Sequence, residues 1–210
     1  MPLLDRNPQL NGDPPVPLLV VISGPSGVGK DTVLMRIREL GLPFHFVVTA
    51  NSRPARPEEI EGLDYHFVTR QRFEQMIADD ELLEWANVYS DYKGIPKFEV
   101  RKAFASGRDV VLRINVDGAA TLKQIAPDAI FIFIAPGSME QLRRRLESRR
   151  TENNDEIEQR LAMAQHEMAQ LQHFDYVVLN HEARLDECVD QIGAIMIAEK
   201  QRVRPRWVSL

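Results

Sequence analysis

The chain has 210 residues, of which 44% are hydrophobic and 27% are charged, and its formal net charge is −5 at pH 7. These values indicate a globular rather than a disordered chain, large enough for one α/β domain with an insertion, and give no general electrostatic support for a nucleic-acid partner. The single cysteine, Cys188, excludes an intrachain disulfide, and no apolar run approaches the length of a membrane span.

The N-terminal part of the chain predicts a flexible leader followed by a buried strand and a helix. Residues 1–16 are rich in Pro, Asn and Asp and lack the apolar segment of a secretory signal, so we expect a cytoplasmic protein and leave an organellar location open. Residues 18–22 form a β-branched, apolar run between Pro and Gly, which is typical of a buried parallel strand. A helix is expected over 30–40, ended by Gly41.

The rest of the chain alternates between predicted strands and helices, apart from one interruption. Strands are expected at 46–48, 65–68, 82–88, 110–114, 130–134 and 176–179. Helices are expected at 70–78, 97–106, 118–125, after the N-cap Ser138, at 155–173 and at 185–199. The alternation predicts a parallel sheet with helices on both faces, whereas residues 50–95 form a small β-rich insertion. Residues 201–210 are expected to be a frayed basic tail.

The stretch GPSGVGKDT, residues 24–32, lies between the first strand and the first helix, as a phosphate-binding loop requires. Its glycines allow backbone N–H groups to turn toward phosphate oxygens, and the helix N-terminus adds partial positive charge. Lys30 would reach the terminal phosphates, but Asp31 stands where the pattern has Ser or Thr. The alternative is a Gly-rich turn without a ligand.

The stretch SRPAR places Arg53 and Arg56 three residues apart in a polar loop. Two converging guanidinium groups would grip a phosphate monoester, as the acceptor of a phosphoryl group requires. The alternative is a pair of ordinary exposed arginines.

Five motifs in order resemble the guanylate kinase family over roughly residues 17 to 200: GPSGVGK, SRPARPEEIEGLDYHFV, LLEWA, LRRRLESRRTE and DYVVLN. The resemblance implies a P-loop kinase fold and transfer of the γ-phosphoryl group of ATP, with Mg²⁺, to GMP and dGMP in purine nucleotide metabolism. It also implies a core at 17–49 and 96–200, a GMP-binding insertion at 50–95 and a lid at about 145–160. Gly-Lys-Asp in the loop and KGIP in the insertion resemble the organelle-type variant.

The resemblance also implies the site residues. The ATP site would comprise Gly24, Pro25, Ser26, Gly27, Val28, Gly29, Lys30, Asp31, Thr32 and Asn180. The GMP site would comprise Thr49, Arg53, Arg56, Tyr65, Glu84, Lys93 and Asn115. The catalytic cations would be Lys30, Arg53, Arg145, Arg149 and Arg160. The choice of Glu84 agrees with its chemistry, because a carboxylate only accepts hydrogen bonds and guanine offers two adjacent donors.

Several residues depart from the family's pattern. Ile95 replaces a hydroxyl that would contact the base, and Lys93 replaces a tyrosine. The family's DIDxQG is RINVDG here, which introduces Arg113, Asn115 and Asp117, and Arg150 replaces a glycine after a lid arginine. Asp31 would ligate Mg²⁺, directly or through water; the alternative is an acidic first-turn residue turned away from the phosphates.

Two other functions are compatible with parts of this pattern. A related P-loop kinase, such as a phosphosugar kinase, could use a different phosphate-monoester acceptor. A catalytically weak, guanylate kinase-like binding module could bind phosphopeptides, although such modules typically lose the loop or lid cations that this chain retains. The oligomeric state is left open.

Overall fold

A computed structural model describes residues 16–57, 59–88, 91–148 and 154–208. The leader expected at 1–16 therefore lies, except for Val16, outside the described residues. The chain forms two compact units: Met1–Pro43 with Arg113–Leu210, and Phe44–Leu112. Among the described residues, no helix is both long and apolar enough to cross a membrane.

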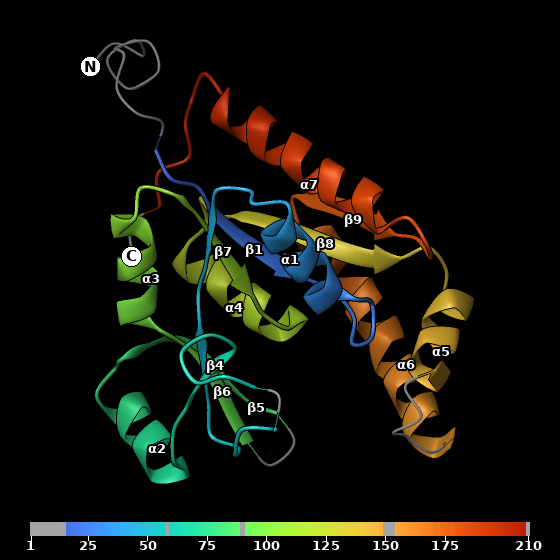
Figure 1. Cartoon of the computed structure of the whole chain (residues 1–210), viewed down its shortest axis with the longest axis horizontal. Coiled ribbons are helices and arrows are strands. Elements are labelled where there is room, and N and C mark those ends of the chain that lie inside the picture. The colour runs from blue at the N-terminus through green and yellow to red at the C-terminus, as the bar shows by residue number, and fades with distance from the viewer. Residues whose placement is uncertain (1–15, 58, 89–90, 149–153, 209–210) are drawn as a thin grey trace. The chain divides into compact units, whose positions relative to one another are not determined.

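Three parallel strands form the centre of the first unit (Figure 1). They are β1 (Leu19–Ser23), β8 (Ile130–Pro136) and β9 (Tyr176–Asn180), with β8 between the other two. Every residue of β1 and β8 is buried, as expected for a parallel strand covered on both faces. The apolar runs thus correctly predicted these strands.

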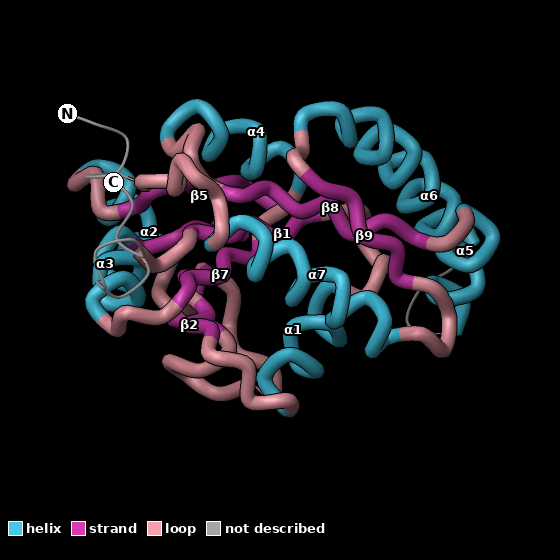
Figure 2. Tube along the Cα trace, turned by 90° about the horizontal axis from the view of Figure 1, so that it is seen from above, coloured by secondary structure: helices cyan, strands magenta, loops and turns pink. Residues whose placement is uncertain are grey.

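Helices cover both faces of these strands, as the alternation predicted. In Figure 2, α1 (Lys30–Glu39) and α7 (Leu185–Lys200) lie on one face, and α4 (Val116–Ile125) and α6 (Asn154–Ala169) lie on the other. A 3₁₀-helix, η3 (Gln170–His173), extends α6.

The helix ends follow from local hydrogen bonds. α5 (Met139–Ser148) begins after Ser138, whose hydroxyl accepts a hydrogen bond from the Gln141 N–H at 3.2 Å, so the predicted N-cap is confirmed. α4 begins two residues earlier than predicted, because the Asn115 side chain caps it by accepting from the Gly118 N–H at 2.9 Å.

Apolar side chains from the helices complete the core of the first unit. Val33, Leu34 and Ile37 are buried along one side of α1, as their spacing predicted. Cys188 is fully buried in α7, and burial raises the pKa of its thiol to about 11. It is therefore an unreactive core residue at neutral pH.

The tail does not fray at Arg206, in contrast to the expectation. Its guanidinium donates to both carboxylate oxygens of Glu199, at 2.9 and 3.2 Å, and to the Ala129 carbonyl at 3.2 Å. Glu199 is 1% exposed and also accepts from the Tyr176 hydroxyl at 2.5 Å. A buried carboxylate needs such partners, so Arg206 is fixed to the first unit by charge.

The second unit contains a four-stranded sheet of order β4-β3-β6-β5. Its strands are β3 (Thr49–Asn51), β4 (Tyr65–Phe67), β5 (Leu82–Val88) and β6 (Asp91–Pro96). α2 (Arg70–Ala78) buries Phe73 and Met76 against Ala50 and Leu82. The unit also contains α3 (Lys97–Ala105). A separate strand, β2 (Phe44–Phe46), pairs in parallel with β7 (Asp109–Arg113).

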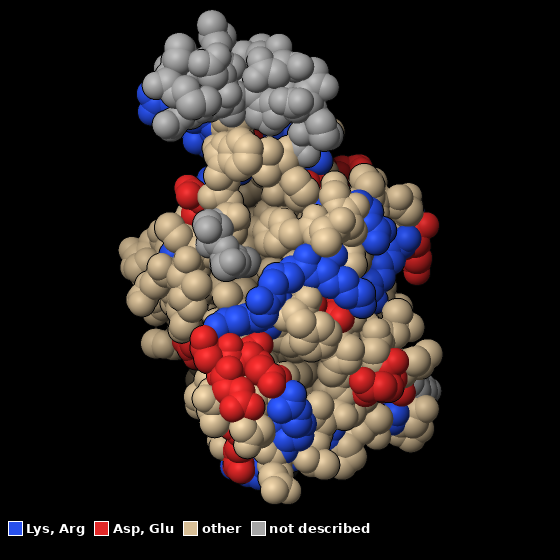
Figure 3. All heavy atoms as spheres, turned by 90° about the vertical axis from the view of Figure 1, so that its left-hand side faces the viewer, with Lys and Arg blue, Asp and Glu red and all other residues tan. Residues whose placement is uncertain are grey.

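One expected strand of this unit was wrong, and one observed strand was missed. The predicted strand at 46–48 is replaced by β2 and β3, which lie on either side of Val47 and Val48. β6 was not predicted, because DYKGIP has Gly and Pro in place of an apolar alternation; its antiparallel pairing with β5 stabilises it instead. Acidic and basic side chains both occur on the face in Figure 3, as the mixed composition suggests.

Candidate active site

The loop between β1 and α1 requires glycine at several positions, of which Gly24 and Gly29 are two. Gly24 has φ = 141°, and a Cβ there would lie 2.1 Å from the Ile134 carbonyl oxygen. Gly29 has φ = 97°, and a Cβ there would lie 2.7 Å from Asn180 Nδ2. Left-handed backbone and the close approach of other residues therefore both exclude side chains. These constraints explain Gly24 and Gly29 of the predicted phosphate loop.

The Lys30 ammonium folds back over this loop. Its Nζ donates hydrogen bonds to the carbonyl oxygens of Gly24, at 2.5 Å, and Pro25, at 3.0 Å. Lys30 is also the first residue of α1, whose N-terminus carries partial positive charge. A positive side chain and a helix N-terminus thus coincide, and this is the arrangement that binds anions.

Arg145 and Asn180 hold the loop from outside. Arg145 Nη1 and Asn180 Nδ2 both donate to the Val28 carbonyl oxygen, at 2.7 and 2.8 Å, and Arg145 Nη2 donates to the Asn180 carbonyl oxygen at 2.8 Å. The structure thus brings a predicted catalytic arginine and a predicted ATP-site residue onto the loop. Their shared backbone acceptor was not foreseen, because a main-chain carbonyl leaves no mark in the sequence.

Glu167 was missed by the sequence analysis. It belongs to α6, and its Oε2 accepts a hydrogen bond from the Ser26 N–H at 3.3 Å. Burial raises the pKa of Glu167. The Glu167 side chain thus occupies one N–H donor of the loop. Little in the sequence indicated this contact, because Glu167 appears there only as one of several acidic residues in a predicted helix.

Asp31 lies in the first turn of α1 and accepts a hydrogen bond from the Arg113 guanidinium. The Asp31 side chain is 69% exposed, and that of Arg113 is 28% exposed. Among the described residues, no group of three or more His, Cys, Asp or Glu side chains could hold a metal ion by itself. One accessible carboxylate beside a phosphate loop still fits Mg²⁺, which often binds one or two carboxylates together with substrate phosphates.

The second unit brings Arg53, Tyr65 and Lys93 together. The Arg53 guanidinium carbon lies 5.4 Å from the centre of the Tyr65 ring, and Lys93 Nζ lies 5.7 Å from the same centre. Thr49 pairs with Tyr65 in the sheet. Two cations and a phenol are therefore grouped at one place, as recognition of a phosphate monoester requires.

Glu59 was not predicted as a site residue. It pairs with the Arg53 side chain and with the backbone of Arg56. Its two oxygens accept from Arg53 Nη1 at 2.6 Å and Nη2 at 2.5 Å, and Oε2 also accepts from the Arg56 backbone N–H at 2.8 Å. The Arg53 guanidinium lowers the pKa of Glu59 to about 2. The Arg56 side chain itself is exposed.

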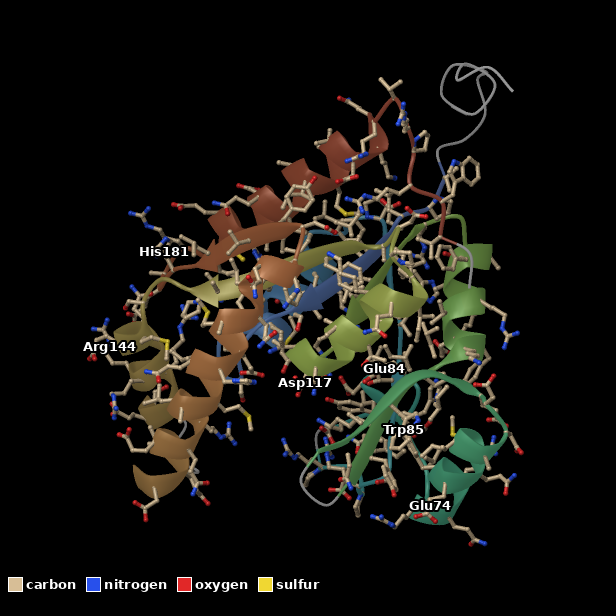
Figure 4. All side chains as sticks on the ribbon, turned by 180° about the vertical axis from the view of Figure 1, so that it is seen from behind. Glu74, Glu84, Trp85, Asp117, Arg144 and His181 are labelled. Carbon is tan, nitrogen blue, oxygen red and sulfur yellow. The ribbon has the colours of Figure 1, made fainter. Side chains whose placement is uncertain are left out.

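Glu84 is a buried carboxyl group on β5, with 8% of its surface exposed. Burial raises its pKa to about 7. Its partner across the antiparallel pair is Ile95, which is 1% exposed and offers no hydrogen bond. Figure 4 marks Glu84 and its neighbour Trp85, which is 44% exposed, on this strand. Glu84 is thus a carboxyl group in an apolar setting, which favours pairing with a donor-rich ligand.

The remaining predicted residues lie in the first unit or outside the described residues. Asn115 is in the first unit, where its side-chain oxygen caps α4, whereas the Arg53–Glu84 group is in the second. Arg160 lies in α6. Arg149, which precedes that helix, lies outside the described residues.

Comparisons with known proteins agree on one family. The family model described as guanylate kinase matches residues 17–199. The chain is 50% identical over 198 residues to "Guanylate kinase 2, chloroplastic/mitochondrial" of Oryza sativa subsp. japonica, covering 94% of this chain and 70% of that protein. It is 42% identical over 192 residues to the guanylate kinase of Carboxydothermus hydrogenoformans, covering 91% and 92%. The crystal structure of guanylate kinase from Anaplasma phagocytophilum superposes with a TM-score of 0.73 at 30% identity and 90% coverage of both chains.

Proposed function

The chain belongs to the guanylate kinase family and transfers the γ-phosphoryl group of ATP to GMP, and on that premise we propose which residues perform each part of the reaction. Residues 17–49 and 96–200 form the ATP-binding core, 50–95 form the GMP-binding insertion, and about 145–160 form the lid. The products are ADP and GDP, and dGMP is a second acceptor in purine nucleotide metabolism.

The loop from Gly24 to Thr32 binds the phosphates of ATP. Its glycines keep the backbone N–H groups accessible, and the N-terminus of α1 together with Lys30 supplies positive charge. Lys30 exchanges its carbonyl partners for phosphate oxygens when the nucleotide binds. Asn180, which touches the loop through Val28, lies beside the nucleotide.

Glu84 recognises the guanine base. The burial of its carboxyl group is the main support for GMP as the phosphoryl acceptor. The Glu84 carboxylate accepts hydrogen bonds from guanine N1–H and the 2-amino group, whereas adenine presents an acceptor at N1 and lacks the 2-amino group. Because Glu84 is 8% exposed, a base that satisfies it is strongly preferred over one that leaves it unpaired. Thr49 supplies a further polar contact to GMP.

Arg53, Arg56, Tyr65 and Lys93 bind the phosphate of GMP. Arg53 is already stacked beside Tyr65 and paired with Glu59, so phosphate binding replaces one bidentate anion by another. Lys93 contributes charge in place of the family's phenol, whereas Ile95 offers no contact to the base.

Phosphoryl transfer is driven by charge stabilisation rather than by proton transfer. An acceptor phosphate oxygen is already ionised at neutral pH, so no general base is required. Lys30, Arg53, Arg145, Arg149 and Arg160 stabilise the charge on the transferred group, and closure of the lid excludes water. Asp31 would hold Mg²⁺ together with ATP phosphates. When bound, Mg²⁺ neutralises charge on the β- and γ-phosphate oxygens.

An acceptor panel tests the proposed division of labour. ADP production is measured with ATP and Mg²⁺ and with GMP, dGMP, AMP, UMP or ribose 1,5-bisphosphate as acceptor. We expect GMP and dGMP to react far faster than the others, and Glu84→Gln to reduce that preference. Preference for the sugar phosphate would indicate a phosphosugar kinase.

A second variant separates an enzyme from a binding module. Lys30→Met should abolish GMP-dependent ADP production while leaving the circular dichroism spectrum unchanged. Equal rates for the parent and this variant would contradict the assigned role of the loop.

For its location, we propose the cytoplasm or the interior of an organelle. The support is the rice relative, whose name includes chloroplastic/mitochondrial. Subcellular fractionation of the source cells checks this.

A further inference from the structure

Two residues that depart from the family's pattern contact each other. Asp31, in the place of the hydroxyl that ends the phosphate-loop pattern, accepts a hydrogen bond from Arg113, at the end of β7. The two residues are 82 positions apart in the chain, and both belong to the first unit. We propose that Arg113 is a positioning residue of the ATP site, which neutralises Asp31 and so makes an acidic phosphate loop compatible with a triphosphate. This inference rests on the proposed role of the loop in binding ATP.

The need for compensation follows from where Asp31 lies. It adjoins Lys30 and stands in the first turn of α1, where the backbone N–H groups favour an anion. An ionised carboxylate at this place competes with the phosphates for the same positive field and repels them. Like charges repel more strongly near a protein surface than in bulk water, so an uncompensated carboxylate beside the phosphates would weaken their binding.

Arg113 is suited to this compensation by its chemistry and its placement. An arginine stays protonated at every physiological pH, so Arg113 supplies a permanent positive charge beside Asp31. Its side chain is 28% exposed, against 69% for Asp31, so the cation is the more fixed partner and the carboxylate the more accessible one. The Asp31 carboxylate therefore remains accessible to solvent, while Arg113 balances its charge.

The pair also predicts a dependence on metal. If Asp31 contributes an oxygen to Mg²⁺, the cation supplies the same compensation as Arg113. Loss of Arg113 should then be most harmful to nucleotide binding without metal, and less harmful when Mg²⁺ is present. A direct contact between Arg113 and ATP would instead be lost under both conditions.

A double-mutant cycle tests the inference by binding rather than by turnover. The dissociation constant of ATP is measured by titration calorimetry, in EDTA and in excess Mg²⁺, for the parent, Arg113→Gln, Asp31→Ser and the double variant. We expect Arg113→Gln to weaken metal-free ATP binding about three- to tenfold in the parent and less than about twofold in the Asp31→Ser background. Equal weakening in both backgrounds, or none in either, would overturn the proposal.

The chain offers a matched control in the Arg36–Asp186 pair. Arg36 is 33% exposed and Asp186 is 66% exposed, and their Nε–Oδ1 distance is 2.7 Å. Arg36 also lies on α1, but in its last turn. Arg36→Gln removes an ion pair of similar exposure, so it should leave the ATP dissociation constant unchanged.

Two further variants make the outcome decisive. Arg113→Lys keeps the charge and should restore metal-free ATP binding to within about twofold of the parent. If Arg113→Gln does not fold, Asp31→Asn tests the pair from the other side: it frees a cation near the phosphates and should tighten metal-free binding about threefold. Unchanged or weaker binding would refute the inference. Failure of the parent itself to bind ATP, or equal ATP affinity of the parent and Lys30→Met, would instead refute the proposed function of the loop.

Discussion

The guanidinium of Arg53 and the carboxylate of Glu59 form a parallel, two-bonded pair, with nitrogen–oxygen distances of 2.6 and 2.5 Å. Glu59 thus occupies the hydrogen-bonding edge with which Arg53 would grip a phosphate. Glu59→Gln keeps the shape but removes the competing charge, so the KM for GMP should fall about threefold. Steady-state kinetics at saturating ATP measures this.

Glu74 provides the control for this change. It pairs with Arg70 at 3.1 Å on the exposed surface of α2 and is marked in Figure 4. Glu74→Gln should leave the KM for GMP unchanged. A higher KM for Glu59→Gln would mean that Glu59 mainly orders the loop.

Glu84 should make stability depend on pH. Its folded-state pKa is raised from 4.5 to about 7, so the folded state binds the proton more tightly than the unfolded state does. The free energy of unfolding should therefore decrease as pH rises from about 4.5 to 7, by an amount on the order of 3 kcal/mol, and this contribution should level off above pH 7. Urea denaturation at several pH values measures the slope.

Glu84→Gln isolates that contribution and tests base recognition at the same time. The slope should be smaller in this variant, which should also be the more stable protein at pH 8. Its GMP affinity should fall about 10- to 100-fold, because one guanine donor then faces an amide N–H₂ group. A variant with an unchanged pH slope and full GMP affinity would exclude Glu84 from both roles.

Arg206 should contribute strongly to stability. Glu199 is 1% exposed, and Arg206→Ala leaves this carboxylate with an incomplete set of partners, so the free energy of unfolding should fall by about 3 kcal/mol. Arg36→Ala, which breaks an exposed pair, should cost less than about 1 kcal/mol. Equal losses in urea denaturation would show that the tail contact stabilises the protein no more than an exposed ion pair does.

Asp31 should govern the metal requirement of the reaction. Asp31→Ser removes a candidate Mg²⁺ ligand. The Mg²⁺ concentration that gives half-maximal activity should therefore increase, by about two- to fivefold. The comparison is a Mg²⁺ titration at fixed total ATP, and superimposable curves for the parent and the variant would exclude Asp31 from metal binding.

The sequence predicted features that depend on neighbours along the chain. The apolar runs at β1 and β8, the helical face of α1 and the cap at Ser138 all follow from local composition and spacing. The glycine-rich loop was also recognisable, because its backbone geometry dictates its residues.

Contacts between distant segments could not be predicted in this way. Asp31 and Arg113 each looked like an isolated departure from a pattern, and their pairing depends on where β7 ends relative to α1. β6 likewise depends on its partner strand rather than on its own residues. Glu167 reaches Ser26 across 141 positions, a relation with no local signature.

The Val28 carbonyl, which accepts from both Arg145 and Asn180, has a consequence for how this site tolerates variation. No substitution at position 28 removes that oxygen, because every amino acid has the same backbone carbonyl. In saturation mutagenesis, the effect of substitutions at position 28 should therefore depend only on side-chain volume. The loss of the two hydrogen bonds to its carbonyl should be detected instead through substitutions at positions 145 and 180. An atom that joins two predicted site residues to the loop would thus leave no trace in the mutational data for its own position.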